Sequence, residues 1–318
     1  MDKEYAFFFS EAFEVAFCRV EMTEKREIET FVRKPVWLRR GVPSDPAGAR
    51  LRSLLEAGRT RTVCQEARCP NCGECFAGGR ATFLILGDHC TRGCRFCGVT
   101  PGEPEPPDPD EPRRIAEAAA GMALGHVVVT SVARDDLADG GAAAFVETIR
   151  ALRTRLPAAR IEVLVPDFRG DAAALQRVLE EHPEVLNHNL ETVARLYPEV
   201  RPRAVYARSL ELLGRSSRHH PAVAVKSGLM LGLGEHAAEV EDALADLLAA
   251  GCRILTLGQY LQPARGRLPV ARYLPPEEFD AWRVAALRMG FERVVSGPFV
   301  RSSYHAEELC APLSQGVR

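Results

Sequence analysis

The chain has 318 residues, of which 46% are apolar, enough to fill the core of one barrel-sized α/β domain. Its 41 Lys and Arg residues nearly balance 43 Asp and Glu residues, and the formal charge is −2. This balance excludes a global basic field of the kind that attracts nucleic acid or an anionic membrane. We therefore expect neither nucleic acid nor a membrane as a partner.

The cysteine content indicates a reducing compartment. Ten cysteines occur in a chain with no recognisable export signal, and in such a compartment thiols bind metals more often than they form disulfides. We predict a cytoplasmic protein. Apolar clusters near the start are interrupted by Glu11 and Glu14 and do not resemble a signal or transit peptide. Residues 1–32 are expected to be a poorly ordered extension, and Met22 is an alternative start.

After this extension, residues 33–43 are basic and contain prolines, which favours an extended arm, and a helix is predicted over 47–57. From there, short apolar runs predict buried strands, and the amphipathic stretches between them predict helices. The predicted strands are 81–87, 126–131, 160–165, 184–189, 223–229, 253–258 and 293–296. The predicted helices are 111–122, 141–155, 171–181, 191–198, 203–213, 235–250 and 276–289.

Alternating strands and helices, with continuously apolar strands, indicate a parallel sheet. The first six strands, with the helices between them, make fewer units than the eight of a closed barrel. We therefore expect an α/β fold built as a partial, open (βα)6 barrel similar to a TIM barrel. Residues 100–109 are rich in proline, which fixes φ and removes donors, so they are predicted to form a stiff surface connector.

Three cysteines follow the first strand of the predicted barrel. Cys90, Cys94 and Cys97 are separated by three and then two residues. Structural zinc takes four protein ligands, and an iron–sulfur cube with a cysteine on every iron also takes four. Three thiolates therefore favour a cube with one iron left open to a small molecule. The alternative is a zinc or disulfide pair with a bystander cysteine.

The segment from Cys90 to Cys97, with the aromatic Phe96 before its last cysteine, resembles the signature of the radical S-adenosylmethionine (SAM) superfamily. The resemblance implies a 4Fe-4S cluster whose open iron binds the amino and carboxylate groups of SAM, with Phe96 near the cofactor. It also implies that this cluster supplies the strongly reducing electron that cleaves SAM. The potentials of such clusters are tuned by exposure and by hydrogen bonds to sulfur.

A second cysteine group precedes the barrel, where four cysteines fall within residues 64–75. Cys69 and Cys72 have the spacing of half a zinc ribbon, but no free CxxC or HxxxH downstream supplies the other half. In the alternative interpretation, Cys64, Cys69 and Cys75 form a second three-cysteine cluster site, and Cys72 is not a ligand.

The second pattern resembles the auxiliary-cluster motif of the lipoyl synthase family, which belongs to the radical SAM superfamily. Residues 301–304, Arg-Ser-Ser-Tyr, resemble a C-terminal motif of that family. By this resemblance, Ser303 ligates the fourth iron of a second 4Fe-4S cluster, with Cys310 as a rival ligand. The predicted parts are then an arm with the auxiliary motif (33–80), the barrel (81–298) and a C-terminal segment (299–318).

The resemblance implies sulfur insertion at C6 and C8 of an octanoyl chain on a carrier-protein lysine, which consumes two SAM and sulfide from the auxiliary cluster. The implied partners are octanoylated lipoyl domains of 2-oxoacid dehydrogenase E2 or the glycine cleavage H protein, a reducing ferredoxin or flavodoxin, and an iron–sulfur carrier for cluster repair. The alternatives are another sulfur-inserting radical SAM enzyme and a zinc-stabilised binding module.

Polar residues at strand ends are candidates for SAM contacts. Arg134 and Asp135 follow the second strand of the barrel, although a helix N-cap is the alternative role of that loop. Asn187 and Asn189 end the fourth, and their amides can hydrogen-bond a polar ligand. His188, between them, is more often a structural histidine than a catalytic one.

Two further segments are interpreted by their composition. The glycines of residues 226–235 lack a dinucleotide fingerprint and indicate close backbone approach to SAM or the acyl chain. Arg265 and Arg267 form either a solvated turn or a contact for an acidic carrier. Cys252 is predicted to be a small buried thiol.

Overall fold

The computed structural model of the chain describes residues 33–39 and 46–309. The chain divides into two units, residues 1–33 and 34–318, and the elements below all belong to the second. The predictions for residues 1–32, the alternative start at Met22 and the rival ligand Cys310 lie outside the described residues.

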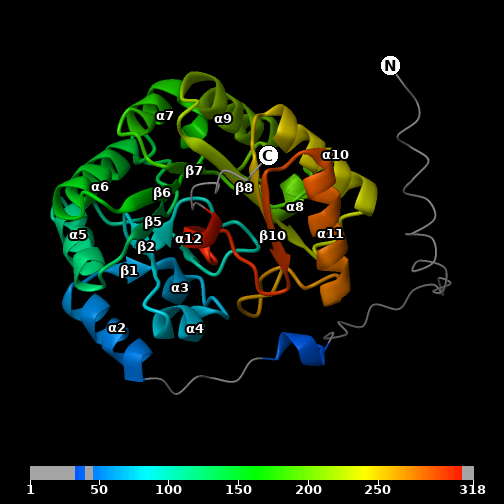
Figure 1. Cartoon of the computed structure of the whole chain (residues 1–318), viewed down its shortest axis with the longest axis horizontal. Helices are drawn as coiled ribbons and strands as arrows, with labels where there is room; N and C mark the ends of the chain where they lie inside the picture. The colour runs from blue at the N-terminus through cyan, green and yellow to red at the C-terminus, as the bar shows by residue number, and fades with distance from the viewer. Residues whose placement is uncertain (1–32, 40–45, 310–318) are drawn as a thin grey trace, which may run out of the picture. The chain divides into compact units, whose positions relative to one another are not determined.

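The main sheet has eight strands in the order β1-β2-β5-β6-β7-β8-β9-β10 (Figure 1). Its strands are β1 (Arg61–Thr62), β2 (Thr82–Ile85), β5 (His126–Ser131), β6 (Arg160–Leu164), β7 (Val185–Asn187), β8 (Ala224–Leu231), β9 (Ile254–Gln259) and β10 (Arg293–Gly297). Strands β2 to β10 pair in parallel, whereas β1 pairs antiparallel with β2. Since β1 and β10 stand at opposite ends of this order, the barrel is open, as predicted.

Helices connect the parallel strands. The helices are α2 (Pro46–Ala57), α3 (Val63–Glu66), α4 (Cys72–Ala77), α5 (Glu111–Gly121), α6 (Ala142–Arg155), α7 (Ala172–Leu179), α8 (Tyr197–Val200), α9 (Tyr206–His219), α10 (Ala237–Ala249), α11 (Pro276–Met289) and α12 (Ala306–Leu309). Short 3-10 turns are η1 (Val36–Leu38), η2 (Phe168–Gly170) and η3 (Ala194–Leu196). In Figure 1, α5, α6, α7 and α9 follow the outer side of the curved sheet, while α12 lies on its inner side.

Two predicted segments differ from the structure. The helix predicted over 191–198 is replaced by η3 and α8, because Glu191 has a φ of 70° and forms an isolated bridge with Leu229, which keeps the chain extended there. The connector over 100–109 begins with a two-residue strand, β4 (Thr100–Pro101), which pairs with β3 (His89–Cys90).

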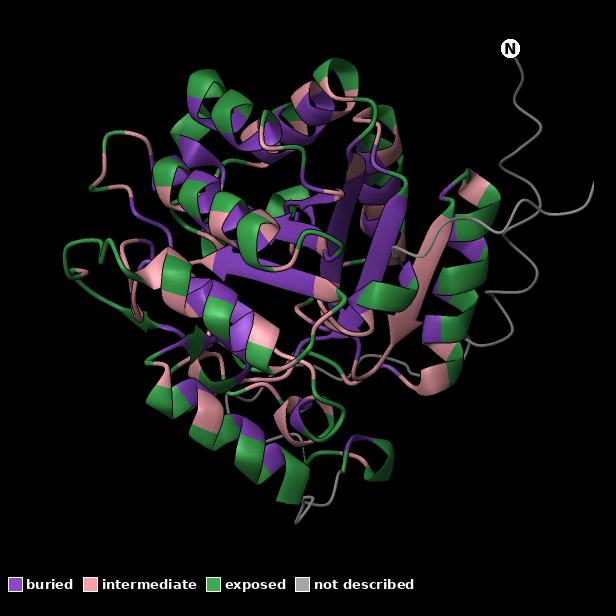
Figure 2. Ribbon diagram, turned by 60° about the vertical axis from the view of Figure 1, so that its left-hand side comes forward, coloured by how far each residue is buried: buried purple, intermediate pink, exposed green. Residues whose placement is uncertain are grey.

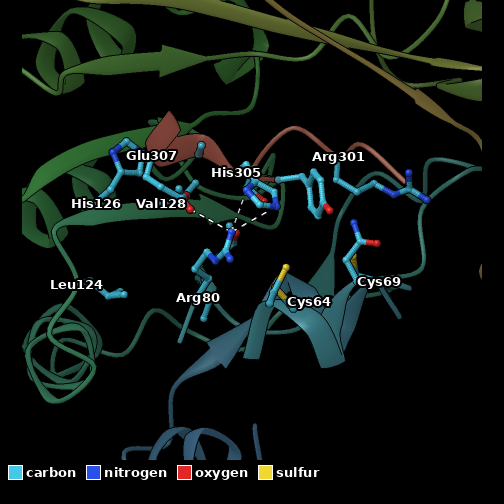
Figure 3. Close-up of a pocket in the computed structure, with 16 residues that line it drawn as sticks. Cys64, Cys69, Arg80, Leu124, His126, Val128, Arg301, His305 and Glu307 are labelled. Carbon is cyan, nitrogen blue, oxygen red and sulfur yellow. Dashed lines mark hydrogen bonds and ion pairs between the residues drawn. The ribbon is translucent and has the colours of Figure 1, made fainter. Parts of the chain in front are cut away.

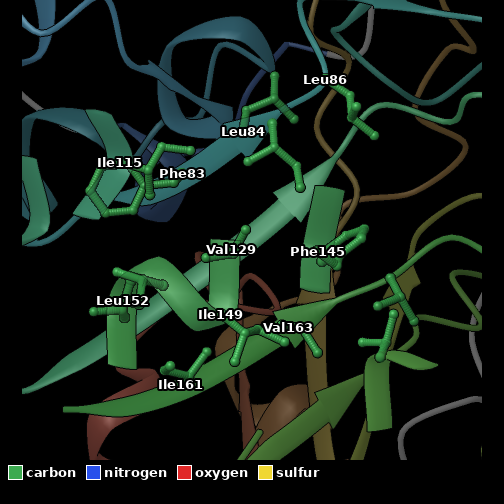
Figure 4. Packing of buried hydrophobic residues seen from close by; sticks show 14 of the residues in the cluster. Phe83, Leu84, Leu86, Ile115, Val129, Phe145, Ile149, Leu152, Ile161 and Val163 are labelled. Atoms are coloured by element: carbon green, nitrogen blue, oxygen red, sulfur yellow. The ribbon is translucent and has the colours of Figure 1, made fainter. Parts of the chain in front are cut away.

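The outer face of the sheet packs against the helices through apolar side chains. Phe83, Val129 and Ile161, from three neighbouring strands, join Ile115 of α5 and Ile149 of α6 in one buried cluster (Figure 4). Figure 2 shows the strands of the sheet largely buried and the outer faces of the helices exposed. Coverage of this kind is typical of a parallel sheet and explains why the strand sequences are so apolar.

The inner face of the sheet carries a buried ionic pair. Lys226 of β8 has its Nζ 2.8 Å from Oε1 of Glu162 on β6, and both side chains are fully buried. Asn187, on β7 between them, donates from Nδ2 to the same oxygen at 3.4 Å, and His126 Nε2 lies 3.5 Å from the other. Although burial acts to raise it, the Lys226 ammonium holds the pKa of Glu162 below its ordinary value. The Glu162 carboxylate is therefore ionised inside the barrel.

We expect the substitution Lys226→Met to destabilise the fold by about 3–5 kcal/mol, because it leaves the Glu162 carboxylate buried without its partner. Arg113→Met is the matched control, since it removes an ion pair with Glu117 whose two side chains are more than half exposed; such pairs contribute at most about 1 kcal/mol. Anaerobic denaturant unfolding of the metal-loaded protein measures both. Equal losses would contradict the assignment of a buried charge pair.

Candidate active site

The loop that carries Cys90, Cys94 and Cys97 is held by backbone hydrogen bonds to distant segments. Cys90 ends β3, and its carbonyl accepts from Gly102 N at 3.0 Å. The backbone of Arg95, in the same loop, donates to a carbonyl at the end of α8 and accepts from a residue beyond β9. All three cysteines are partly buried free thiols. The cysteines therefore lie in a loop whose path is fixed by the barrel.

The chemistry of these thiols fits a bound metal cluster. Burial raises the pKa of Cys94, and it raises that of Cys97 to about 12. A bare thiol in such surroundings stays protonated at neutral pH, whereas a metal ion stabilises the thiolate directly.

The second cysteine group surrounds a separate cavity. Cys64 of α3, Cys69, Cys75 of α4 and Ser303 of the C-terminal segment all line it (Figure 3). Cys72 is not among the described residues that line this cavity. The four predicted auxiliary ligands are thus brought together from two parts of the chain more than 200 residues apart.

Burial disfavours the bare thiolate of two cysteines that line this cavity, Cys64 and Cys75. Burial, with a smaller contribution from the neighbouring cysteines, raises the pKa of Cys64 to about 12. It raises that of Cys75 to about 11. Cys64 and Cys75 are therefore thiolates only when a cation compensates their charge.

The C-terminal segment is fastened over the cysteine arm by polar contacts. Asn71, which is buried, donates from Nδ2 to the carbonyl of Phe299 at 2.6 Å. The hydroxyl of Tyr304 donates to Oε1 of Glu74 at 2.9 Å. These contacts flank Ser303 on both sides and fix it at the cavity.

A third contact closes the same segment. Arg80 Nη1 lies 3.1 Å from Glu307 Oε1 and also contacts the ring nitrogens of His305 (Figure 3). Both members of the Arg80–Glu307 pair are partly exposed, so the pair contributes little to stability. Its role is to align α12 with the arm.

The spacing of the cysteine sulfurs argues against single zinc ions. A tetrahedral zinc with Zn–S bonds of about 2.3 Å brings its sulfurs to about 3.8 Å from one another. Among the described residues, only His305, Glu307 and Glu308 form a group of three whose ligand atoms all lie within 4.8 Å of one another. Neither cysteine trio of the described residues is contracted to that size.

The two cysteine groups meet through the main chain. A Cβ atom added to Gly98, the residue after Cys97, would lie 2.7 Å from the carbonyl oxygen of Ala67, between Cys64 and Cys69. Such a contact is too short for any side chain. Glycine at position 98 therefore lets the two cysteine-bearing loops touch.

Comparison with known proteins identifies the family. Residues 84–247 match the model of the radical SAM superfamily. The chain is 55% identical to the lipoyl synthase of Nitrosococcus oceani over 294 residues, 92% of this chain and 89% of that protein. It is 55% identical to the lipoyl synthase of Methylococcus capsulatus over 88% of this chain and 87% of that protein. The chain belongs to the lipoyl synthase family.

Solved structures support the fold of this lipoyl synthase family member. Methylornithine synthase superposes with a TM-score of 0.50 at 16% identity, covering 79% of this chain and 82% of that one. SuiB of Streptococcus suis, in a structure bound to S-adenosylmethionine, gives a TM-score of 0.53 at 9% identity, covering 71% of this chain and 54% of that one. Membership of the radical SAM superfamily implies a 4Fe-4S cluster and SAM.

The predicted SAM contacts have protein partners in the structure. Arg134 forms a two-pronged pair with Asp136 and contacts the carbonyl of Leu86. Asp135 accepts two hydrogen bonds from Arg92. Both residues therefore organise the loop after β5.

The residues at the end of β7 differ in how fully their polar atoms are hydrogen-bonded. Asn187 donates from Nδ2 to Glu162, and Asn189 donates from Nδ2 to Glu191 at 3.1 Å. The Oδ1 atoms of both asparagines are buried and have no hydrogen-bond partner among the described residues. His188 contacts the carbonyl of Val165 and the hydroxyl of Ser209, each within 2.9 Å. Burial, helped by the Arg201 charge, lowers the pKa of His188 to about 4. His188 is therefore a neutral, satisfied structural histidine.

Phe96, which the resemblance places near the cofactor, and Cys252 both pack against apolar side chains. Phe96, the aromatic residue of the first motif, packs against the second core cluster, in which Leu257 and Tyr260 are buried. Cys252 is fully buried and contacts the carbonyl of Ile254, as the prediction of a small buried thiol requires.

Sequence reasoning missed Arg201, which lies beside the first cysteine group. Its Nη1 donates to the carbonyls of Asn189 and Leu190 and to the hydroxyl of Tyr197. Although burial, the largest influence, raises the pKa of Cys94, the Arg201 charge acts to lower it. Nothing in its spacing from the cysteines marks this arginine, which follows α8 and lies just beyond the helix predicted over 191–198.

In the part of the chain that the structure describes, no helix is both long enough and apolar enough to span a membrane.

Proposed function

We propose that this chain is a lipoyl synthase that inserts sulfur at C6 and C8 of a protein-bound octanoyl-lysine. One observation carries the proposal: Cys64, Cys69, Cys75 and Ser303 surround one cavity in a chain that also presents a three-cysteine SAM motif.

The residues divide between two clusters in this proposal. Cys90, Cys94 and Cys97 hold the cluster that binds SAM, and the group of four around the cavity holds the auxiliary cluster. When bound, the first supplies the electron that cleaves SAM, and the second supplies the sulfur atoms. Serine oxygen is a harder and less usual iron ligand than cysteine sulfur. Its weaker link at Ser303 suits a site that has to open when sulfur leaves.

The barrel positions and protects the substrates. In this proposal the barrel excludes water and other hydrogen donors from the reactive centre, and holding the acyl chain in near-attack geometry provides selectivity. Among the proposed SAM contacts, Asn189 and Asn187 have buried Oδ1 atoms that lack a hydrogen-bond partner among the described residues. Phe96, Arg134 and Asp135 then act by shaping the site, since the two charged side chains already have protein partners.

Partners follow from the same proposal. We expect octanoylated lipoyl domains or the glycine cleavage H protein as substrates, a ferredoxin or flavodoxin as electron donor, and an iron–sulfur carrier that rebuilds the auxiliary cluster. Arg267 donates to the carbonyl of Val99 at 3.0 Å, so its turn packs on the loop after Cys97. We place the protein in the cytoplasm on the argument from its cysteine content.

The direct test is an anaerobic reaction with an octanoyl-lysine peptide, SAM and a strong reductant. We expect mass spectrometry to show two hydrogens replaced by two sulfurs, with two molecules of SAM cleaved for each product. A chain that cleaves SAM but never transfers sulfur to the peptide would contradict the proposal.

Metal analysis separates this function from a zinc-stabilised binding module. We expect about eight irons and eight sulfides per chain after anaerobic reconstitution, since each 4Fe-4S cluster holds four of each. Zinc without a visible chromophore would favour the module, and about four irons would leave only the SAM cluster.

A further inference from the structure

Arg92 lies inside the first cysteine motif, and its side chain is almost completely buried. The guanidinium donates from Nε to Asp135 Oδ2 at 2.8 Å and from Nη2 to Asp135 Oδ1 at 2.7 Å. Nη2 also donates to Asp167 Oδ1 at 2.5 Å. One arginine of the cluster loop thus binds two carboxylates, which follow β5 and β6.

The second carboxylate is itself firmly held. The Asp167 side chain is 1% exposed, accepts the backbone N–H of Arg169 at 3.0 Å, and contacts Arg208 Nη1 of α9 at 3.3 Å. Although burial acts to raise it, the Arg92 guanidinium lowers the pKa of Asp167 to about 2. The anchor is therefore a buried ion that is also held by Arg169 and Arg208.

The residue before Arg92 is attached to the same place. Thr91 Oγ1 donates to the carbonyl of Ala133 at 2.9 Å and accepts the backbone N–H of Asp135 at 3.1 Å. The chain between Cys90 and Cys94 is therefore fastened by main chain and side chain to the loop after β5.

The backbone of Arg92 contacts a cluster ligand. Its N–H donates to Cys90 Sγ at 3.5 Å. Hydrogen bonds to cluster sulfurs stabilise the more negative, reduced state and tune the potential. The anchored side chain and this donor belong to one residue, so the position of the side chain determines where the N–H points.

We propose that Arg92 is a positioning residue for the SAM-binding cluster: by bridging Asp135 and Asp167 it holds its own N–H on the Cys90 sulfur and orients the three thiolates toward the SAM site. The inference goes beyond the proposed sulfur insertion and needs only the SAM-cleaving half of the reaction. Lysine in its place keeps the charge but lacks the planar fork that serves two carboxylates at once.

The test compares Arg92→Lys with Arg208→Lys in the full chain, reconstituted anaerobically. Arg208 contacts the same Asp167 carboxylate from α9 but is no part of the cluster loop, so it is the matched control. Four quantities are measured without octanoyl substrate: iron content, melting temperature, the midpoint potential of the cluster, and the change that SAM causes in its EPR spectrum. These readouts do not depend on whether sulfur is ever inserted.

We expect Arg92→Lys to keep its iron and melt close to the parent protein. Its midpoint potential shifts to a lower value, the SAM-dependent EPR change weakens, and reductive SAM cleavage falls at least tenfold, while Arg208→Lys stays within twofold of the parent. An unchanged potential and EPR response in Arg92→Lys would overturn the proposal. So would equal losses in both variants, which would mark a purely structural network. If Arg92→Lys loses iron, Asp135→Asn, which keeps the arginine, provides the same comparison.

Discussion

Replacing Cys90 by alanine is expected to reduce SAM cleavage to the background rate. Cys90 ends β3 and is one of only three thiols in its group, so its loss leaves two ligands for a cluster that needs three. Reconstituted Cys90→Ala protein should lose the iron of the SAM cluster, about four per chain. The measurement is 5'-deoxyadenosine released from SAM under strong reductant.

Cys252→Ala is the control for thiol loss. Cys252 is also a free cysteine, but it is fully buried in the second core cluster and belongs to neither cysteine group. It should cleave SAM at the parent rate. If Cys90→Ala still released 5'-deoxyadenosine at a comparable rate, the assignment of this motif to SAM cleavage would be wrong.

Replacing Cys64 by alanine is expected to have the opposite pattern: SAM cleavage remains, and sulfur insertion disappears. Cys64 is the most buried thiol of the auxiliary cavity, so alanine there removes a ligand without adding bulk. The iron content should again fall by about four per chain. Deoxyadenosine release and sulfur transfer to the octanoyl peptide are measured in the same reaction.

Cys72→Ala is the matched control, because Cys72 lies in the same short stretch but does not line the cavity. It should retain both activities and the full iron content. Equal loss of both activities in Cys64→Ala would count against separate roles for the two groups, and loss of iron in Cys72→Ala would contradict the choice of ligands.

The long elements of the fold could be predicted from the sequence because their patterns are local. Strand β5 and helix α11 have the predicted bounds, 126–131 and 276–289. A run of β-branched residues and an amphipathic stretch that begins at a proline are signals that need no distant partner. The short elements, such as β1, α3 and β3, exist only through tertiary contacts and have no periodicity of their own.

The candidate site divides in the same way. The cysteine ligands could be predicted from their spacing, because these clusters bind cysteines that lie close together in the chain. The hydrogen-bond network around Arg92 could not be predicted from the sequence, since its carboxylate partners lie 43 and 75 residues further along the chain. For the same reason, Arg134 and Asp135 were interpreted as ligand contacts when their nearest partners are protein charges.

The close approach of Gly98 to Ala67 limits how far apart the two cysteine groups lie. Since there is no room for a side chain at position 98, the two loops meet peptide against peptide, and in the proposed reaction this contact limits the gap between hydrogen loss and sulfur capture. A methyl group at position 98 would lie too close to the Ala67 backbone and force one of the two loops to shift, and with it the cysteine group that the loop carries.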